Sequence, residues 1–431
     1  MTLAGDTVEG GPAPKGGRAA QAWYGLALLS LVSFFNYLDR MVVAVLIEPI
    51  KLDLDLSDTQ MGLVGGLAFA LFYSICGLPL ARLADRTNRV NLLSVCLAGW
   101  SLATAATGYA ASFWQLFAAR VAVGVGEAGC VPTSHSMIGD MFPPAKRTLA
   151  VGIFQAGGLL GLSAGMAVAG WLAEIWGWRQ AIIVVGLSGI PLALLFWLTV
   201  REPVRGTVTI GESEREPWSE ALAALLARPA LRNVVLGLSI GAFATYGTGQ
   251  WAAAFFMRSH GLTVAEAGVY GAIIAGGSAV LGTLCSGLVM MALRPRDIRW
   301  ETWLPAICYA ICTPLFVLMF LADTLVVALA CQFVGTFLGA IGGTVAIASI
   351  QSFAEPHRRA TAVALMVMLS SLIGLGLGPL AVGMISDALT PLHGADALGT
   401  ALAIASAFLG VAAVLFAIAS RSAQLSAAEP A

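Results

Sequence analysis

Long apolar runs alternate with short polar segments along most of the 431-residue chain. About 20 consecutive apolar residues suffice for a helix to cross a bilayer, and the runs lack the strict alternation of a membrane barrel. Twelve runs can be marked: 23–47, 60–80, 90–110, 114–137, 148–173, 180–200, 232–257, 266–293, 303–321, 324–352, 361–386 and 399–419. The longest interruption follows the sixth run. The pattern therefore predicts twelve membrane-spanning helices in two groups of six.

The interruptions also predict how the chain is divided. We expect a disordered N-terminus over 1–20, a first six-helix bundle over 21–200, a linker over 201–231, a second six-helix bundle over 232–420 and a tail over 421–431. Within the linker, residues 218–227 fit a short amphipathic helix on the membrane surface, and a plain tether fits equally well.

The basic residues predict an orientation. If the N-terminus is cytoplasmic, 18 of the 23 Lys and Arg residues fall on the inner side, 3 fall on the outer side, and Arg40 and Arg120 lie within spans. Cytoplasmic loops of membrane proteins carry an excess of Lys and Arg. We therefore expect a multi-pass protein of the cell (inner) membrane with both termini and the linker in the cytoplasm.

Composition excludes several classes of function. The chain is 58% hydrophobic and 11% charged, whereas soluble domains carry about 25% charged residues. The net charge of −1 and the lack of a basic patch give no sign of nucleic-acid binding. The seven cysteines form no Cys-x-x-Cys and the four histidines are scattered, so no metal site is expected. No Walker loop or Ser-His-Asp arrangement indicates ATP hydrolysis or catalysis.

Two of the predicted spans contain charged residues where hydrocarbon is expected. Asp39 and Arg40 are adjacent in the first run, and Asn36 shares their helix face because successive residues are about 100° apart. Arg120 and Glu127 in the fourth run are about two turns apart and also share a face. A charge deep in a bilayer costs at least about 2.5 kcal/mol, and such residues usually have a function. We expect the fold to bring the two faces together.

The loop between the second and third runs carries a motif. Ala81-Arg-Leu-Ala-Asp85-Arg86-Thr-Asn88-Arg89 resembles the signature loop of the major facilitator superfamily, Gly-x-Leu-x-Asp-Arg-x-Gly-Arg. Ala81 and Asn88 replace its two usual glycines. The resemblance implies that Asp85, Arg86 and Arg89 act as a conformational latch through contacts at the cytoplasmic helix ends. The alternative is an ordinary basic cytoplasmic loop.

Shorter motifs narrow the resemblance. They are Asn36-Tyr37-Leu38-Asp39-Arg40, Gly126-Glu127-Ala128, Ile138-Gly139-Asp140-Met141-Phe142 and Arg201-Glu202-Pro203-x-Arg205-Gly206. These segments resemble the Spinster branch of the superfamily, which includes exporters of sphingoid and lysophospholipid-type lipids. The anion:cation symporters of sugar acids also carry Asn-Tyr-x-Asp-Arg and Glu-Ala-Gly-x-x-Pro, which Glu127-Ala128-Gly129-x-x-Pro132 matches. Both branches remain open.

The resemblance implies the major facilitator fold, an all-α polytopic membrane protein of two pseudo-symmetric six-helix bundles. It also implies a monomeric secondary transporter that needs no cofactor and works by alternating access. Spans 1, 4, 7 and 10 are innermost in this fold. Here spans 1 and 4 hold every deep charge and spans 7 and 10 offer neutral groups, which suits an amphipathic, lipid-like substrate. The expected substrate-binding residues are Asn36, Tyr37, Arg40, Arg120, Glu127, Tyr246, Gln250 and Trp251.

A proton-coupling mechanism follows from the same residues. A carboxyl group that gains and loses Arg120 as the helices move would bind and release a proton in each cycle. Asp39 and Glu127 both compete for Arg120 in this scheme. We favour Asp39 as the proton site, with Glu127 and Arg120 at the substrate head group. In the alternative function, Arg40 and Arg120 would hold the carboxylate of a small organic anion.

Glycines mark two further spans. The fifth run is rich in glycine, which predicts close packing against another helix. The eleventh run carries Gly374-x-Gly376-x-Gly378-Pro379, where the proline frees a backbone carbonyl. This segment is interpreted either as a bending point or as a packing surface.

Overall fold

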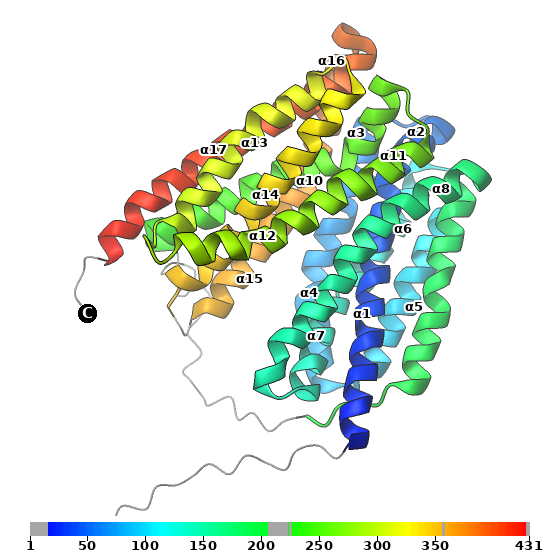
Figure 1. Ribbon diagram of the computed structural model, residues 1–431. Coiled ribbons are helices and arrows are strands. Elements are labelled where there is room, and N and C mark those ends of the chain that lie inside the picture. The colour runs from blue at the N-terminus through cyan, green and yellow to red at the C-terminus, as the bar shows by residue number, and fades with distance from the viewer. Residues whose placement is uncertain (1–15, 206–222, 224–225, 356–357, 428–431) are drawn as a thin grey trace, which may run out of the picture.

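The computed structural model describes residues 16–205, 223, 226–355 and 358–427, and these are helical almost throughout, with no β-strand among them (Figure 1). The first half of the chain forms α1 (Gly16–Val45), α2 (Ile47–Leu54), α3 (Asp58–Gly62), η1 (Leu63–Leu67), α4 (Ala68–Arg86), α5 (Arg89–Thr107), α6 (Phe113–Glu127), α7 (Cys130–Met141) and α8 (Pro144–Thr199). The second half forms α10 (Pro229–His260), α11 (Val264–Tyr270), η2 (Gly271–Gly276), α12 (Gly277–Leu293), α13 (Trp300–Leu321), α14 (Leu325–Phe353), α15 (Arg359–Leu369), η4 (Ser370–Leu377), α16 (Gly378–His393), η5 (Gly394–Asp396) and α17 (Ala397–Ala427).

The predicted all-α membrane fold is confirmed, because each of the twelve apolar runs lies in these helices. Nine helical segments of the described residues are long and apolar enough to cross a membrane, and Pro144–Thr199 and Thr361–Arg421 each contain two runs. The remaining run, 232–257, lies in α10, which is not among the nine. The break between the fifth and sixth runs falls at Gly177, where φ is 79°, a conformation that glycine adopts without steric cost.

The ends of the bundles differ from the predicted boundaries by a few residues. Helix α1 begins at Gly16, so the predicted disorder does not hold for 16–20, while residues 1–15 lie outside the described part. Helix α17 continues to Ala427, past the predicted end at 420. Most of the predicted linker, including most of the suggested surface helix 218–227, lies outside the described residues.

The two halves contact each other mainly at one end of the molecule. We call this the distal end, where α1 ends and α17 begins, and the opposite end the proximal end. One buried apolar cluster, which includes Ile50, Leu56, Phe255 and Phe320, joins residues of both halves. Two further clusters belong to the first and the second half respectively. The helices converge toward the distal end and spread toward the proximal end (Figure 1).

Small residues allow the two halves to approach closely along this seam. A Cβ atom on Gly62 would lie 2.6 Å from the carbonyl oxygen of Pro379, and one on Gly383 would lie 2.3 Å from that of Asp58. The segments η1, η2 and η4 lie in spans 2, 8 and 11, which all contact the other half. π-Helical turns often occur at functional sites. The predicted bending point in the eleventh run therefore coincides with the π-helical segment before Pro379 and with close packing.

Most glycines of the fifth run pack closely against another helix, as predicted, and Gly170 packs against Val264 of the second half. Cβ atoms on Gly157 and Gly161 would lie 2.3 and 2.1 Å from carbonyl oxygens of Ser30 and Phe34 on α1. Helix α1 therefore lies directly against α8, because small residues let two backbones approach. This contact places the charged segment of α1 in the interior of the first half.

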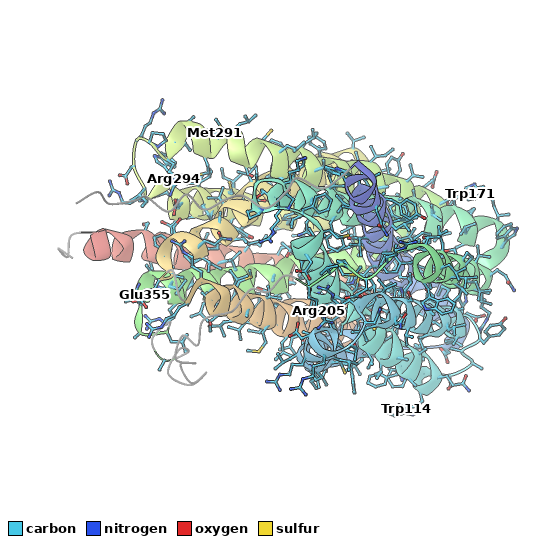
Figure 2. The ribbon with its side chains drawn as sticks, turned by 90° about the horizontal axis from the view of Figure 1, so that it is seen from below. Trp114, Trp171, Arg205, Met291, Arg294 and Glu355 are labelled. Carbon is cyan, nitrogen blue, oxygen red and sulfur yellow. The ribbon has the colours of Figure 1, made fainter. Side chains whose placement is uncertain are left out.

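Charged residues at the proximal end bind partners in their own half. Arg205 donates to the carbonyl oxygen of Ala84 at the end of α4, and Arg294 pairs with Glu301 at 2.8 Å. Seen from below, Arg294 and Glu355 lie at opposite edges of the second half, and Arg205 lies away from both (Figure 2). The proximal ends of the halves are thus held internally, whereas the distal ends are held to each other.

Candidate functional site

An ion pair deep in the first half forms the centre of the candidate site. Nε of Arg40 on α1 lies 2.7 Å from Oε2 of Glu127 at the end of α6. The Glu127 side chain is fully buried and that of Arg40 is 17% exposed. Burying one of these charges alone would be strongly unfavourable, and the pairing offsets that cost. The structure therefore brings spans 1 and 4 together through their charged faces, as expected.

Three aromatic rings surround the Arg40 guanidinium group. Its carbon lies 5.2 Å from the ring centre of Tyr37, 5.0 Å from that of Phe69 and 4.9 Å from that of Tyr73. A cation over an aromatic face is attracted by the electrons of the ring. Tyr37 was expected here. Phe69 and Tyr73 were not, although their spacing of four residues places them on one face of the second span.

Asp39 and Arg120 are buried near this pair and within electrostatic range of each other and of Glu127, as expected, but no ion pair or hydrogen bond joins them in the described residues. Oδ2 of Asp39 accepts a hydrogen bond of 3.2 Å from Thr104 on α5. The guanidinium group of Arg120 lies 5.2 Å from the ring of Phe69, and its Nε has no hydrogen-bond partner among the described residues. Arg120 and Glu127 are separated by about 10 Å along their helix. Arg40, which comes from the facing helix, is therefore the base that pairs with Glu127.

Several buried polar atoms of this region have no partner among the described residues. They are both side-chain amide atoms of Asn36, Oδ1 of Asp39, Oε1 of Glu127, and the hydroxyl groups of Thr133 and Ser134 on α7. Buried polar groups are nearly always hydrogen-bonded, so such a concentration indicates a place where a polar ligand, a proton or water can bind. The site offers acceptors, donors and a carboxylate within one bundle.

The expected substrate-binding residues of the second half differ in how exposed they are. Tyr246 on α10 is 49% exposed and lies near enough to Arg40, Tyr37 and Tyr73 to interact with them electrostatically. Gln250 is 8% exposed and packs against Gly65 of the second span. Tyr246 therefore remains suited to substrate contact.

Trp251 does not fit the expected role. Its side chain is fully buried, and its Nε1–H donates a 2.9 Å hydrogen bond to the carbonyl oxygen of Pro379. That carbonyl lies at the start of α16, so the indole holds α10 against α16. We expected the ring to line the substrate site because Trp251 lies on an innermost span. The helical period alone does not show which neighbouring helix covers a residue, and here α16 covers Trp251.

The predicted latch residues divide into two groups. Arg89 is 2% exposed, and its side chain lies 2.5 Å from Asp140 and 2.7 Å from Glu202. The side chains of Asp85 and Arg86 are exposed, and no ion pair is found for them within the described residues. Asp140 and Glu202 belong to the motifs at 138–142 and 201–206, for which we expected no particular role. In this conformation Arg89 holds the start of the linker against the first half.

Metal binding finds no support in the described residues, where no group of three His, Cys, Asp or Glu side chains could hold an ion.

The site is a pair of opposite charges beside two further buried charges and several free hydrogen-bonding atoms. Such an arrangement can bind a polar head group and exchange a proton.

Comparison with known proteins gives consistent relatives. Residues 29–379 match the model of a family described as the Major Facilitator Superfamily. An MFS-type efflux pump of Mycolicibacterium smegmatis is 33% identical over 384 residues, covering 89% of this chain and 88% of that protein. Human protein spinster homolog 1 is 29% identical over 402 residues, covering 84% of this chain and 73% of that protein.

A solved structure and a second kind of relative complete the comparison. The crystal structure of a bacterial homolog of the human lysosomal transporter Spinster, in an inward-facing and unoccupied conformation, superposes with a TM-score of 0.87, 32% identity and coverage of 95% of this chain and 99% of that one. A Bacillus subtilis protein named as a probable galactarate/D-glucarate transporter is 25% identical over 366 residues, covering 77% of this chain and 79% of that protein.

Proposed function

The chain belongs to the major facilitator superfamily, and on this premise we propose that it moves an amphipathic, lipid-like substrate by proton-coupled alternating access. One observation carries the proposal: the charged residues of the candidate site all come from the first half, whereas Tyr246 of the second half is uncharged and within electrostatic range of Arg40. An amphipathic molecule can place its polar head at Arg40 and Glu127 and its apolar tail along the second half. The similarity to human protein spinster homolog 1 supports the resemblance to the Spinster branch, which implies a lipid-type substrate.

The orientation belongs to the same proposal. The excess of Lys and Arg near the proximal end favours a cytoplasmic location for that end and for both termini, in the cell membrane. The distal end, where the halves are in contact, is then extracytoplasmic. On this assignment the described conformation faces inward, as does the bacterial Spinster homolog with the TM-score of 0.87.

Proton coupling is proposed from burial and geometry. Asp39 is 2% exposed, and only its Oδ2 accepts a hydrogen bond from a described residue. Arg120 is 2% exposed and its Nε is free to donate. A movement of α6 relative to α1 that brings this base to Asp39 favours the ionised carboxylate, and its withdrawal favours the protonated acid. Glu127, already held by Arg40, serves the substrate head group.

A second candidate function is symport of a small organic anion such as a sugar acid. The similarity to the galactarate/D-glucarate transporter of Bacillus subtilis favours it, because that protein also covers most of this chain. In this case Arg40 and Arg120 would bind a carboxylate of the substrate. Glu127 would then have to release Arg40 before the anion binds.

Transport by purified protein in proteoliposomes separates the two functions. We expect uptake of a fluorescent lysophospholipid that rises with an imposed pH gradient and falls when an ionophore collapses the gradient. Protein-free liposomes and the Arg40→Ala variant control for passive insertion of the lipid, because that variant lacks the base at the proposed head-group site. Gradient-driven uptake of D-glucarate at micromolar concentration, with no protein-dependent movement of the lysolipid, would instead establish the anion symporter.

A further inference from the structure

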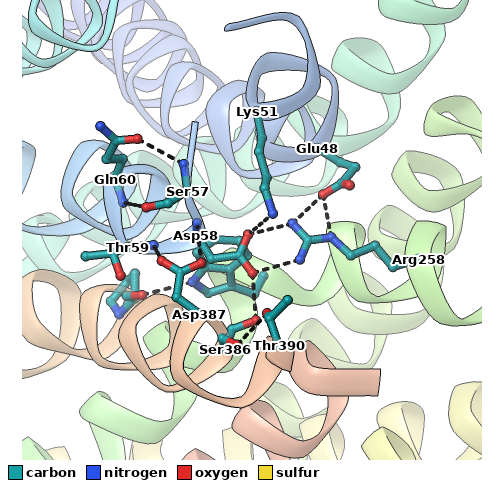
Figure 3. Close-up of polar contacts among 12 residues, drawn as sticks. Glu48, Lys51, Ser57, Asp58, Thr59, Gln60, Arg258, Ser386, Asp387 and Thr390 are labelled. Atoms are coloured by element: carbon teal, nitrogen blue, oxygen red, sulfur yellow. Dashed lines mark hydrogen bonds and ion pairs between the residues drawn. The ribbon is translucent and has the colours of Figure 1, made fainter. Parts of the chain in front are cut away.

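A second charged cluster lies at the distal end, away from the site described above. It consists of Glu48 and Lys51 on α2, Asp58 at the start of α3, Arg258 near the end of α10, and Ser386 and Asp387 on α16 (Figure 3). We call this group the distal clamp, because its members come from both halves of the chain.

Arg258 of the second half binds two acids of the first half. Its Nη1 and Nη2 each lie 2.8 Å from an oxygen of Asp58, and its Nε lies 2.6 Å from Oε2 of Glu48. The Arg258 side chain is 15% exposed and that of Asp58 is 2% exposed. Bidentate pairing of a guanidinium group with a carboxylate is strong and geometrically specific. This contact therefore joins α10 to α2 and to the start of span 2 with a defined geometry.

Asp387 makes a second connection between the halves, in which the second half supplies the acceptor and the first half the donors. Its carboxylate accepts hydrogen bonds from the backbone N–H groups of Asp58 at 3.0 Å and Thr59 at 2.7 Å. These N–H groups begin span 2, where the first donors of a helix have no partner within the helix. Ser57 supplies an N-cap from the first half by accepting from Gln60. The second half thus supplies further acceptors for the N-terminus of span 2.

Separating the halves would affect the members of the distal clamp unequally. Asp58 would keep Lys51, whose Nζ lies 2.6 Å from Oδ1 and belongs to the same half. Arg258 would lose both of its acidic partners, because Glu48 and Asp58 are the only acids with which it pairs in the described residues. The ring of Trp251, which lies 5.9 Å away on the same helix, would stay near it. Arg258 is therefore the member whose interactions depend most on closure.

We propose that the distal clamp stabilises the conformation in which the distal ends of the halves are closed, and that it sets the balance between this conformation and the one in which they separate. The inference rests on the proposed function in that the halves must move relative to each other. Helix α10 carries both Arg258 and Tyr246, and span 2 carries both Asp58 and Phe69. Each pair is about 16–18 Å apart along one helix, so distal opening and the candidate site are connected through two continuous spans.

Double electron–electron resonance measures this balance without any substrate. Spin labels are placed on cysteines introduced at Leu52 on α2 and Leu392 on α16, which are 71% and 81% exposed, in a chain whose native cysteines are replaced. Arg258→Gln removes the bridge to both acids. We expect the ratio of long to short label distances to rise about tenfold or more, since hydrogen bonds between charged groups are among the stronger ones.

A matched control comes from the same end of the molecule. Arg179 on α8 pairs with Asp53 on α2 at 2.7 Å, and both belong to the first half. Arg179→Gln removes an ion pair without affecting the contact between halves, so its distance distribution should equal that of the unsubstituted chain. An increase as large as that of Arg258→Gln would overturn the inference, because any loss of distal charge would then suffice.

Two further variants keep the test decisive. Asp387→Ala removes the acceptors for span 2, whereas Asp387→Asn keeps one oxygen, so the alanine variant should open more than the asparagine variant. If Arg258→Gln does not fold, Arg258→Lys retains the charge without the bidentate geometry and should still shift the distribution. Unchanged distances in Arg258→Lys and Asp387→Ala would refute the distal clamp. A wrong substrate assignment would appear only in the transport assay, because the distance measurement needs no substrate.

Discussion

Replacing Gly62 by alanine should shift the protein toward the conformation in which the distal ends separate. The new Cβ atom would lie 2.6 Å from the carbonyl oxygen of Pro379 and 2.9 Å from Cα of Leu380. Both are backbone atoms of α16 and cannot rotate away. The contact exists only while span 2 and α16 are together, so the substitution penalises the closed distal end and not the open one.

The magnitude follows from this geometry. Adding a group to a close-packed contact costs about 1–3 kcal/mol. Alanine is also favoured over glycine within a helix by about 1 kcal/mol, but this gain is the same in both conformations and cancels. The ratio of open to closed molecules should therefore rise about 5-fold to 150-fold. Overall stability should fall by less than the penalty, because the open form relieves the contact.

Gly77→Ala is the control on the same span. A Cβ atom on Gly77 would have no heavy atom within 4 Å, so this variant should receive the helix-propensity gain alone. The assay is the distance distribution between labels at Leu52 and Leu392, supported by thermal unfolding of both variants. If Gly62→Ala and Gly77→Ala give the same distribution, the close approach of span 2 to α16 does not limit distal opening and the reasoning is wrong.

Three other substitutions test separate parts of the structure. Asp39→Asn imitates the protonated acid, so the protein should fold and exchange substrate while uptake driven by a pH gradient is lost in proteoliposomes; normal gradient-driven uptake would exclude this residue as the coupling site. Arg89→Gln removes the group that joins Asp140 to Glu202 and should lower the free energy of unfolding by about 1.5–3 kcal/mol, seen as a reduced Tm. An unchanged Tm would show that the network is not stabilising. Trp251→Phe keeps the buried ring but loses its hydrogen bond, so it should cost about 0.5–1.5 kcal/mol of stability and leave substrate affinity unchanged. A tenfold loss of affinity would return this residue to the binding site.

The helices could be predicted from the sequence because each is a local feature. A run of about 20 apolar residues must form its backbone hydrogen bonds within itself in a bilayer, so run length and position predict the spans. The break at Gly177 is also a local feature. Gly177 is the only glycine between the fifth and sixth runs, and glycine adopts a positive φ angle without steric cost. The location of deep charges on spans 1 and 4 could likewise be read directly from the sequence.

The partners of those charges could not be predicted in the same way. The helical period shows that Arg120 and Glu127 share a face. It does not show that Glu127 forms its ion pair with Arg40, which comes from another helix. Asp39 turns toward Thr104, and Trp251 is covered by α16, because the rotation of each helix is set by packing with its neighbours. The helix face and the membrane depth of a charged residue depend on its own helix. The residue with which it pairs depends on how several helices pack together.

The distal clamp shows the limit most clearly. Arg258 and Asp58 are 200 residues apart in the sequence, and Asp58 and Asp387 are 329 apart. Each lies near the end of a span, where charged residues are common at the membrane surface. The sequence therefore gives no indication that these residues pair with one another. Only the approach of the two halves, made close by glycines at the seam, turns these separate surface charges into one buried network. The sequence by itself therefore determined the spans and their charged faces, and the tertiary structure alone decided which charges meet.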